Sequence, residues 1–183
     1  AGVCLLSSLE RLCARLEGLK GEVLTLSERA KVAGSCLYGV DLSPQALELS
    51  RLCVLERVLI GLSLSEGSDE VNKRALKELG EALKTHFTCA DALLGALDAR
   101  SFDVVVGNPP YIDSEAMKRA HPQLRKSLSA RFKSCKGNWD LFVPFVELSL
   151  KLLKPQGALA LVTPRQLISA DYAAALHRHL LTY

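Results

Sequence analysis

The chain has 183 residues, 49% of them hydrophobic and 23% charged, which suits one globular domain and excludes a disordered chain. No apolar run reaches membrane-spanning length and no signal-peptide pattern is present, so the sequence does not indicate a membrane-spanning or secreted protein. The formal net charge of +3 is too small to indicate a nucleic-acid partner by itself.

Six cysteines are spread along the chain without a C-x-x-C pair: Cys4, Cys13, Cys36, Cys53, Cys89 and Cys135. Most have apolar neighbours, so we expect buried free thiols in a reducing cytoplasm rather than a disulfide framework. The spacings typical of zinc ligands are absent, and we expect no metal site.

The first part of the chain has helical patterns. Leucines at helical spacing predict a helix over residues 1–20. A short second helix is expected over residues 27–33, with Ser27 as its N-cap and Gly34 as its end.

A predicted strand over residues 36–41 ends in an acid, Asp41. Ser43 and Pro44 follow, and they suit the N-cap and first position of a helix that runs to about Ile60. An acid at a strand end just before a helix is where Rossmann-like folds hold a ribose. The alternative is that Asp41 only caps a turn.

The next strand also precedes an acid. We expect a polar loop over residues 61–69, an exposed helix over residues 70–84, and a strand over residues 85–90 that leads to Asp91 and Ala92. Asp91 is a second candidate ligand-binding acid, or a cap of the turn that follows.

Residues 101–112 combine a strand with a stiff turn. The run Phe-Asp-Val-Val-Val predicts a strand buried on both faces, as inside a parallel sheet. Asn108, Pro109, Pro110 and Tyr111 then form a rigid corner at the carboxyl end of that strand, where open α/β sheets bind ligands.

This corner suits transfer to a planar amine. The exocyclic amino group of a base is a poor nucleophile because its lone pair is delocalised into the ring. The side-chain carbonyl of Asn108 and the backbone carbonyl of Pro109 can each accept one of its hydrogens, and Tyr111 offers a flat face for stacking. The alternative is a proline-rich turn that only ends a strand.

A basic stretch follows the corner. Seven cations and no acid lie between Ala116 and Trp139: Lys118, Arg119, Arg125, Lys126, Arg131, Lys133 and Lys136. Because the stretch comes directly after Tyr111, we interpret it as a loop that contacts phosphates. The alternative is a solvated surface segment.

The C-terminal part has a helix, a turn, a strand and a helix. Trp139 is interpreted as a core or loop anchor. The helix after it is expected to place four apolar residues on one face: Leu141, Phe145, Leu148 and Leu152. A turn over residues 154–157, a strand over residues 158–162 and a helix over residues 171–181 with Tyr172, Leu176 and Leu180 inward complete the chain.

The stretch FDVVVGNPPYI resembles the catalytic motif of S-adenosylmethionine-dependent methyltransferases that modify exocyclic or amide nitrogens. The later stretch FKSCKGNWDLFVPFVELSLKLLKPQGALALVTP is similar to the DNA adenine-N6 methyltransferases of type II restriction-modification systems, including those fused to a nuclease. The resemblance covers nearly the whole chain and is weakest at about residues 61–84. It implies a Rossmann-like class I core over residues 1–183: an α/β fold with a mostly parallel, doubly wound sheet and helices on both faces.

The resemblance also implies roles for individual residues. The catalytic residues would be Asn108, Pro109, Pro110 and Tyr111. The methyl donor would contact Gly2, Asp41, Leu42, Asp91, Ala92, Asn108 and Phe145. In the family, the acid matching Asp41 binds the donor's ribose, the acid matching Asp91 contacts its adenine amine, and the aromatic matching Phe145 packs against its adenine. For Phe145 the alternative is plain core packing.

The first residues resemble the tail of the family's glycine-rich turn, D-P-x-C-G-x-G, with Gly2 as its last glycine. The strand before that turn and its earlier glycine are not in the sequence, and neither are the family's last strands and its target-recognition region. We therefore expect a piece of a longer enzyme, truncated at both ends.

The predicted function is methyl transfer from S-adenosylmethionine to adenine N6 in DNA, with the base flipped out of the duplex at a cost of a few kcal/mol. The expected partners are DNA and a fused or separate nuclease and target-recognition domain, with no membrane. One alternative is a protein-glutamine N5 methyltransferase that acts on release factors. The other is a degenerate donor-binding module that serves as a subunit or scaffold.

Overall fold

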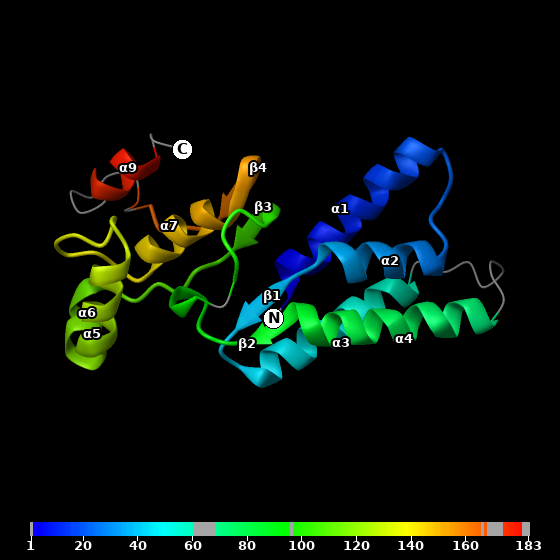
Figure 1. Ribbon diagram of the computed structural model, residues 1–183, viewed down its shortest axis with the longest axis horizontal. Coiled ribbons are helices and arrows are strands. Elements are labelled where there is room, and N and C mark those ends of the chain that lie inside the picture. Colours follow the sequence, from blue (N-terminus) through cyan, green and yellow to red (C-terminus); the bar gives the residue numbers. More distant parts are fainter. Residues whose placement is uncertain (1, 61–68, 96, 166, 168–173, 181–183) are drawn as a thin grey trace. The chain divides into compact units, whose positions relative to one another are not determined.

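The computed structural model describes residues 2–60, 69–95, 97–165, 167 and 174–180 (Figure 1). The chain divides into two compact units, residues 1–96 and residues 97–183. Both combine helices with parallel strands, so the predicted α/β class and the parallel pairing are confirmed. Each unit is described by itself.

The described part of the first unit contains four long helices and a two-stranded parallel sheet. In chain order its elements are α1 (Val3–Lys20), α2 (Leu26–Cys36), β1 (Gly39–Asp41), α3 (Pro44–Ile60), α4 (Asp69–His86), β2 (Phe87–Cys89) and the 3₁₀ turn η1 (Ala92–Leu94). Its core includes buried aliphatic residues from all four long helices, together with Phe87. The predicted loop over residues 61–69 lies outside the described residues apart from Asp69, which begins α4.

The start of α2 differs from the prediction. Thr25, not Ser27, is the N-cap, because its hydroxyl accepts from the Glu28 N–H while its own N–H donates to the Glu28 carboxylate. Gly34 does not end the helix, which continues to Cys36. A Cβ at Gly34 would lie 3.4 Å from that of Ala82, so this glycine is a place of close approach between α2 and α4.

The two strands of the first unit are shorter than predicted, since α4 extends to His86 and β1 begins only at Gly39. They pair in parallel, with Gly39 opposite Phe87 and Asp41 opposite Cys89. Parallel pairing in this register places the carboxyl ends of both strands at one edge of the sheet.

The second unit is built around β3 (Phe102–Gly107) and β4 (Leu153–Leu161), which also pair in parallel. The helices among its described residues are α5 (Ser114–Ala120), α6 (Pro122–Arg131), α7 (Phe142–Leu152) and α9 (Ala174–Leu180). Residues buried in this unit include Met117, Leu128, Phe132, Trp139, Phe142, Val143 and Leu176. The buried positions of Trp139 and Leu176 confirm the predictions for both, whereas Tyr172 lies outside the described residues.

The predicted turn over residues 154–157 lies inside β4 as an irregularity. Phe102 pairs with Leu153, but Val104 already pairs with Ala158, so β4 carries extra residues at this point. Gly157 is required there, because a Cβ would come within 3.0 Å of the Asp103 backbone oxygen and 2.9 Å of the Leu153 side chain. The bulge therefore sets the register of everything that follows in β4.

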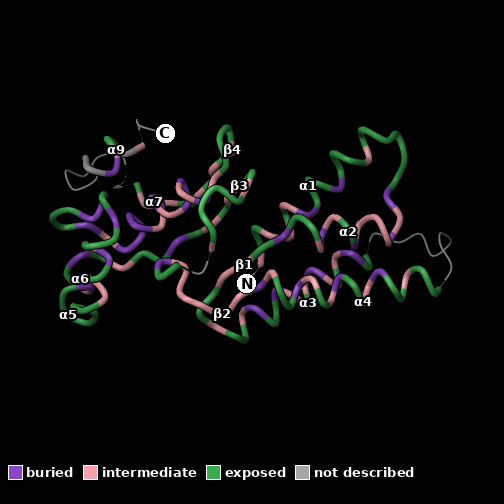
Figure 2. Tube along the Cα trace, in the orientation of Figure 1, coloured by how far each residue is buried: buried purple, intermediate pink, exposed green. Residues whose placement is uncertain are grey.

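The prediction that β3 is buried on both faces is wrong. Val104 is 57% exposed and Val106 is 36% exposed, and Figure 2 shows the strand as a mixture of exposed and intermediate positions. The physical reason is that β3 pairs only with β4 among the described residues, so the sheet of this unit has too few strands and covering helices to bury both of its faces.

The prediction that four apolar residues form the inward face of α7 is partly wrong. Leu141, just before the helix, and Leu152 are buried, but Phe145 and Leu148 are only partly buried. The helix is buried almost all round, and the residues at 145, 148 and 151 form its more open stripe.

The expectation of buried thiols is confirmed for only some cysteines. All six are free, but only Cys13 and Cys135 are buried, while Cys4, Cys36 and Cys89 are exposed. Apolar neighbours in sequence do not bury a cysteine that faces outward from a helix or ends a strand. Among the described residues, no helix has the length and apolar character needed to cross a membrane.

Candidate active site

The predicted catalytic corner lies at the carboxyl end of β3. Pro109 is buried, whereas Asn108 and Pro110 are exposed and Tyr111 is 52% exposed. The Asn108 carboxamide is therefore accessible to a substrate. A carboxamide turned into the hydrophobic interior could not have bound one. The buried proline anchors a turn whose polar groups remain accessible.

The Tyr111 hydroxyl connects the corner to the end of β4. Its oxygen lies 2.6 Å from Asn108 Oδ1 and 2.8 Å from the backbone oxygen of Val162. The Val162 N–H donates to the Gly107 carbonyl at 3.0 Å, which continues the β3–β4 pairing to this point. No sequence pattern predicts the contact with Val162, because the contact is made by its backbone oxygen and not by its side chain.

A second attachment holds the residues just after the corner. The Leu141 N–H donates to the Ile112 carbonyl at 2.8 Å, and the Ser114 N–H donates to Asp140 Oδ1 at 2.8 Å. Asp113 caps α5 by accepting from the Ala116 N–H at 2.8 Å. The corner is thus fixed to β4 through Tyr111 and to the start of α7 through the segment after it.

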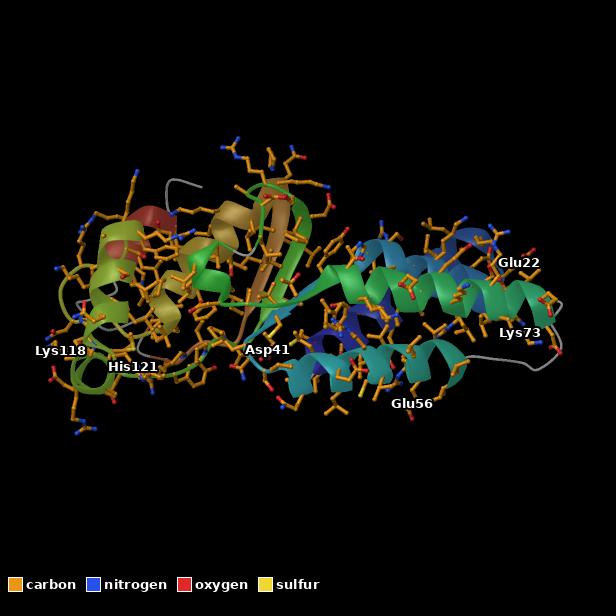
Figure 3. All side chains as sticks on the ribbon, turned by 60° about the horizontal axis from the view of Figure 1, so that its bottom comes forward. Glu22, Asp41, Glu56, Lys73, Lys118 and His121 are labelled. Carbon is orange, nitrogen blue, oxygen red and sulfur yellow. The ribbon has the colours of Figure 1, made fainter. Side chains whose placement is uncertain are left out.

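In the first unit, Asp41 and Asp91 follow neighbouring strands at the same edge of the sheet, and the Ala90 N–H donates to the Asp41 backbone oxygen at 3.1 Å. Figure 3 labels Asp41. One oxygen of Asp41 accepts from the Ser43 N–H at 2.8 Å, and one oxygen of Asp91 accepts from the Leu93 N–H at 2.9 Å. The capping role considered for each acid is therefore real. The other carboxylate oxygen of each makes no hydrogen bond within the described part of the chain and remains available to a ligand.

Gly2 has a conformation that fits the end of a glycine-rich turn. Its φ is +77°, and a Cβ would lie 3.2 Å from the Ser50 hydroxyl on α3. Leu42, beside Asp41, is 71% exposed, and Ala92 is partly buried. These residues and the two acids belong to the first unit, whereas Asn108 and Phe145 belong to the second.

The basic stretch forms helices, so the prediction of a loop is wrong. It covers most of α5, all of α6 and the segment after α6; Figure 3 labels Lys118 and His121 there. Lys118 pairs with Glu115 at 2.7 Å and donates to Asn138 at 2.9 Å. Its charge is already partnered.

Arg125 is a structural residue. Its guanidinium lies 4.3 Å from the centroid of the Trp139 ring and donates to the backbone oxygens of Trp139 at 2.9 Å and Gly137 at 2.8 Å. The other five predicted DNA-binding side chains are exposed and have no ion pair or side-chain hydrogen bond within the described residues: Arg119, Lys126, Arg131, Lys133 and Lys136.

Sequence reasoning missed Glu147, which is fully buried in α7. Its carboxylate accepts from the Ser134 hydroxyl and N–H, both at 2.7 Å, and from the Lys133 N–H at 3.2 Å, and it pairs with Lys151 at 2.7 Å. Burial alone would raise the pKa of Glu147, but the Lys151 and Ser134 bonds outweigh it and lower the pKa to about 2. The available signal was an acid four residues before a lysine in an otherwise apolar helix.

Glu147 thereby attaches the segment that carries Lys133 and Lys136 to α7. The same segment contains Cys135, whose pKa is raised to about 12 by burial and by the nearby Glu147 charge. This thiol is protonated at neutral pH and serves as a buried packing residue.

A family model and several known proteins match this chain. The family model described as Eco57I restriction-modification methylase matches residues 35–182. The Type II restriction enzyme and methyltransferase RM.Eco57I of Escherichia coli is 25% identical over 190 aligned residues, covering 95% of this chain and 18% of that protein.

Two further relatives are named as methyltransferases alone. The Type II methyltransferase M.BstVI of Geobacillus stearothermophilus is 30% identical over 150 residues, which is 80% of this chain and 24% of that protein. The Type II methyltransferase M.XhoI of Xanthomonas vasicola is 30% identical over 152 residues, which is 82% of this chain and 25% of that protein. The chain thus spans a quarter or less of the length of these relatives. With most of its residues matched by the family model, the chain belongs to the Eco57I restriction-modification methylase family.

Proposed function

We propose that the protein carrying this chain transfers a methyl group from S-adenosylmethionine to adenine N6 in DNA. The observation that carries the proposal is the accessible Asn108 carboxamide, held by Tyr111 at the carboxyl end of a parallel strand in a member of a DNA methylase family. The relatives named as Type II methyltransferases support DNA as the substrate rather than a release factor.

The chain's own residues would prepare the target amine. The Asn108 side-chain carbonyl and the Pro109 backbone carbonyl would accept hydrogen bonds from the two N–H groups of the amine. These bonds would draw the delocalised lone pair out of the ring and back onto the nitrogen. The half-exposed ring of Tyr111 would stack on the flipped base. Positioning and fixed dipoles would supply the rate enhancement, without a general base at the start.

S-adenosylmethionine, when bound, would supply an electrophilic methyl group on a sulfonium. The residues of the first unit fit its binding: Gly2 has the positive φ of a glycine turn, and Asp41 keeps one carboxylate oxygen for a ribose hydroxyl. We propose that Leu42, Asp91 and Ala92 also line the donor site, and that Phe145, on the open stripe of α7, packs against the donor's adenine.

The DNA backbone would contact the five unpartnered cations, not all seven predicted ones. Lys118 and Arg125 would not contact phosphates, because Lys118 is paired with an acid and the Arg125 guanidinium is hydrogen-bonded to backbone oxygens. The five remaining cations lie on α5, on α6 and on the segment that Glu147 attaches to α7. Contacts from such side chains to phosphates would position the protein on the DNA.

We propose that a fused or separate nuclease acts together with this methyltransferase, because the Escherichia coli relative is named as both a restriction enzyme and a methyltransferase. A reducing compartment such as the cytoplasm also belongs to the proposal, since all six cysteines are free thiols.

The first experiment tests the catalytic corner in the complete gene product. Asn108→Ala should abolish transfer of a tritiated methyl group to DNA, while donor affinity measured by calorimetry stays close to that of the wild type. Nuclease digestion of the product should yield N6-methyladenine. Equal losses of transfer and donor binding would contradict the assignment, as would label found on release-factor protein and not on DNA.

A second experiment tests the DNA contacts. Lys126→Gln with Arg131→Gln should reduce the slope of log affinity against log salt by about 2, since each phosphate that the protein neutralises adds about 0.9 to that slope. Lys73→Gln with Lys77→Gln on α4 is the matched control and should leave the slope unchanged. An unchanged slope in the first pair would exclude phosphate contact by α6.

A further inference from the structure

The Tyr111 hydroxyl lies between two oxygen acceptors although it carries one proton. Its oxygen is 2.6 Å from Asn108 Oδ1 and 2.8 Å from the Val162 carbonyl oxygen. Both distances are those of an O–H···O hydrogen bond, but a single O–H donates only one of them. The remaining contact would bring two lone pairs together without a proton between them.

A half-turn of the carboxamide removes this conflict. It exchanges the oxygen and nitrogen of Asn108 with almost no change of shape. The Nδ2–H then donates to the tyrosine oxygen, and the hydroxyl is free to donate to Val162. The Val162 carbonyl offers no such exchange, because a backbone carbonyl oxygen can only accept a hydrogen bond.

We infer that the Tyr111 hydroxyl is a positioning group that sets the orientation of the Asn108 carboxamide: held by Val162, it accepts from Nδ2 and directs Oδ1 away from itself. Asn108 is exposed, so without this contact its amide would exchange orientations in water. The backbone of β4 thus determines which end of the amide remains free.

This inference rests on the proposed function and adds a role that stacking does not supply. Methyl transfer to an exocyclic amine needs an acceptor at Asn108, since the amine presents two N–H groups. An amide that presented its own NH₂ to the substrate would repel that amine. The aromatic face of Tyr111 would bind the base, while its hydroxyl would keep the acceptor pointed at the amine.

Tyr111→Phe separates these two roles, because it keeps the ring and removes the hydroxyl. In single-turnover assays with saturating tritiated donor and DNA, the rate should fall about twofold, because an amide without the contact has Oδ1 in the productive orientation only about half of the time. DNA and donor affinities should remain within about twofold, because stacking and phosphate contacts are retained. Tyr38→Phe makes the same chemical change in the first unit and should leave the rate unchanged.

The amide orientation has its own readout that does not need activity. The chain has three asparagines, Asn72, Asn108 and Asn138, so ¹⁵N labelling of asparagine gives few carboxamide signals. In the wild type, one Asn108 Nδ2 proton should exchange slowly with solvent, and Tyr111→Phe should abolish that protection. Asn108→Ala identifies the signal.

Two outcomes overturn the inference: a Tyr111→Phe rate equal to that of the wild type, or Asn108 carboxamide signals that are the same in both proteins. Failure of the proposed function gives a different result. In that case the wild type transfers no label to DNA, while the hydroxyl-dependent protection of Asn108 is still present.

Discussion

Replacing the buried acid of α7 is the sharpest test of how the second unit is held together. Glu147 is 0% exposed and receives three hydrogen bonds from Lys133 and Ser134 in addition to its ion pair with Lys151. Glu147→Gln keeps the shape but removes the charge and turns an NH₂ group towards donors. We expect a large loss of stability because several buried donors lose their acceptor together.

The magnitude follows from the pKa of Glu147, which is lowered from an ordinary 4.5 to about 2. Each step of one in pKa is worth about 1.4 kcal/mol, so the fold favours the charged form by about 3 kcal/mol. Because the folded pKa lies below the unfolded one, this stabilisation is fully present above pH 4.5 and is lost as the pH falls towards 2.

The assay is urea unfolding followed by the fluorescence of Trp139, the one tryptophan in the chain, which is 1% exposed and reports on the second unit. At neutral pH, Glu147→Gln should lower the free energy of unfolding by about 3 kcal/mol. Glu115→Gln is the control, since its pair with Lys118 is exposed and such pairs contribute about 0–1 kcal/mol.

The pH dependence provides the refutation. The difference between the wild type and Glu147→Gln should stay constant from neutral pH to about pH 4.5 and shrink below it. A difference below about 1 kcal/mol at neutral pH, or one that does not change in acid, would show that the carboxylate does not stabilise this unit in its charged form.

Three further changes test single contacts. Thr25→Ala should lower the stability of the first unit by about 1 kcal/mol in thermal unfolding followed by circular dichroism, whereas Ser27→Ala should have little effect; equal effects would contradict the observed cap. Asp140→Ala should lower the stability reported by Trp139 by about 1–2 kcal/mol because the buried Ser114 N–H loses its acceptor, and Asp140→Asn, which keeps an acceptor oxygen, should restore most of it. Gly157→Ala should cost about 1–3 kcal/mol in the same assay, since its Cβ would meet backbone oxygens at 3.0 Å; a neutral result would mean that the bulge rearranges freely.

Local patterns predicted the elements whose signals lie within a few residues. Ser43 and Pro44 start α3 as expected, since the Ala46 N–H donates to the Ser43 hydroxyl at 3.2 Å and the helix begins at Pro44. The acids at the ends of β1 and β2 and the exposed Asn108 also lie where the pattern places them. The caps formed by Ser43, Asp41 and Asp91 are each made with neighbours in the chain.

The errors over β3 and Arg125 have a shared cause, because contacts between residues far apart in the sequence decide both burial and hydrogen-bond partners. The N-cap of α2 is a different case, because Thr25 is selected over Ser27 by reciprocal bonds with the nearby residue Glu28. A β-branched run such as β3 predicts a strand, but its burial depends on how many strands and helices cover it. The charge of Arg125 suggests phosphate contact, and only the fold shows that the guanidinium already binds the Trp139 loop.

The geometry of the corner is fixed by residues that no motif contains. The carbonyl of Val162 reaches Tyr111 only because β4 pairs with β3 in one register. The extra residues around Gly157, which follow the Phe102–Leu153 pair along the strand, set that register. A slip by one residue would put a different backbone group beside the phenol and reverse the side chains of β4. The motif therefore specifies which groups meet the substrate, while a bulge near the start of β4 determines how its amide is oriented.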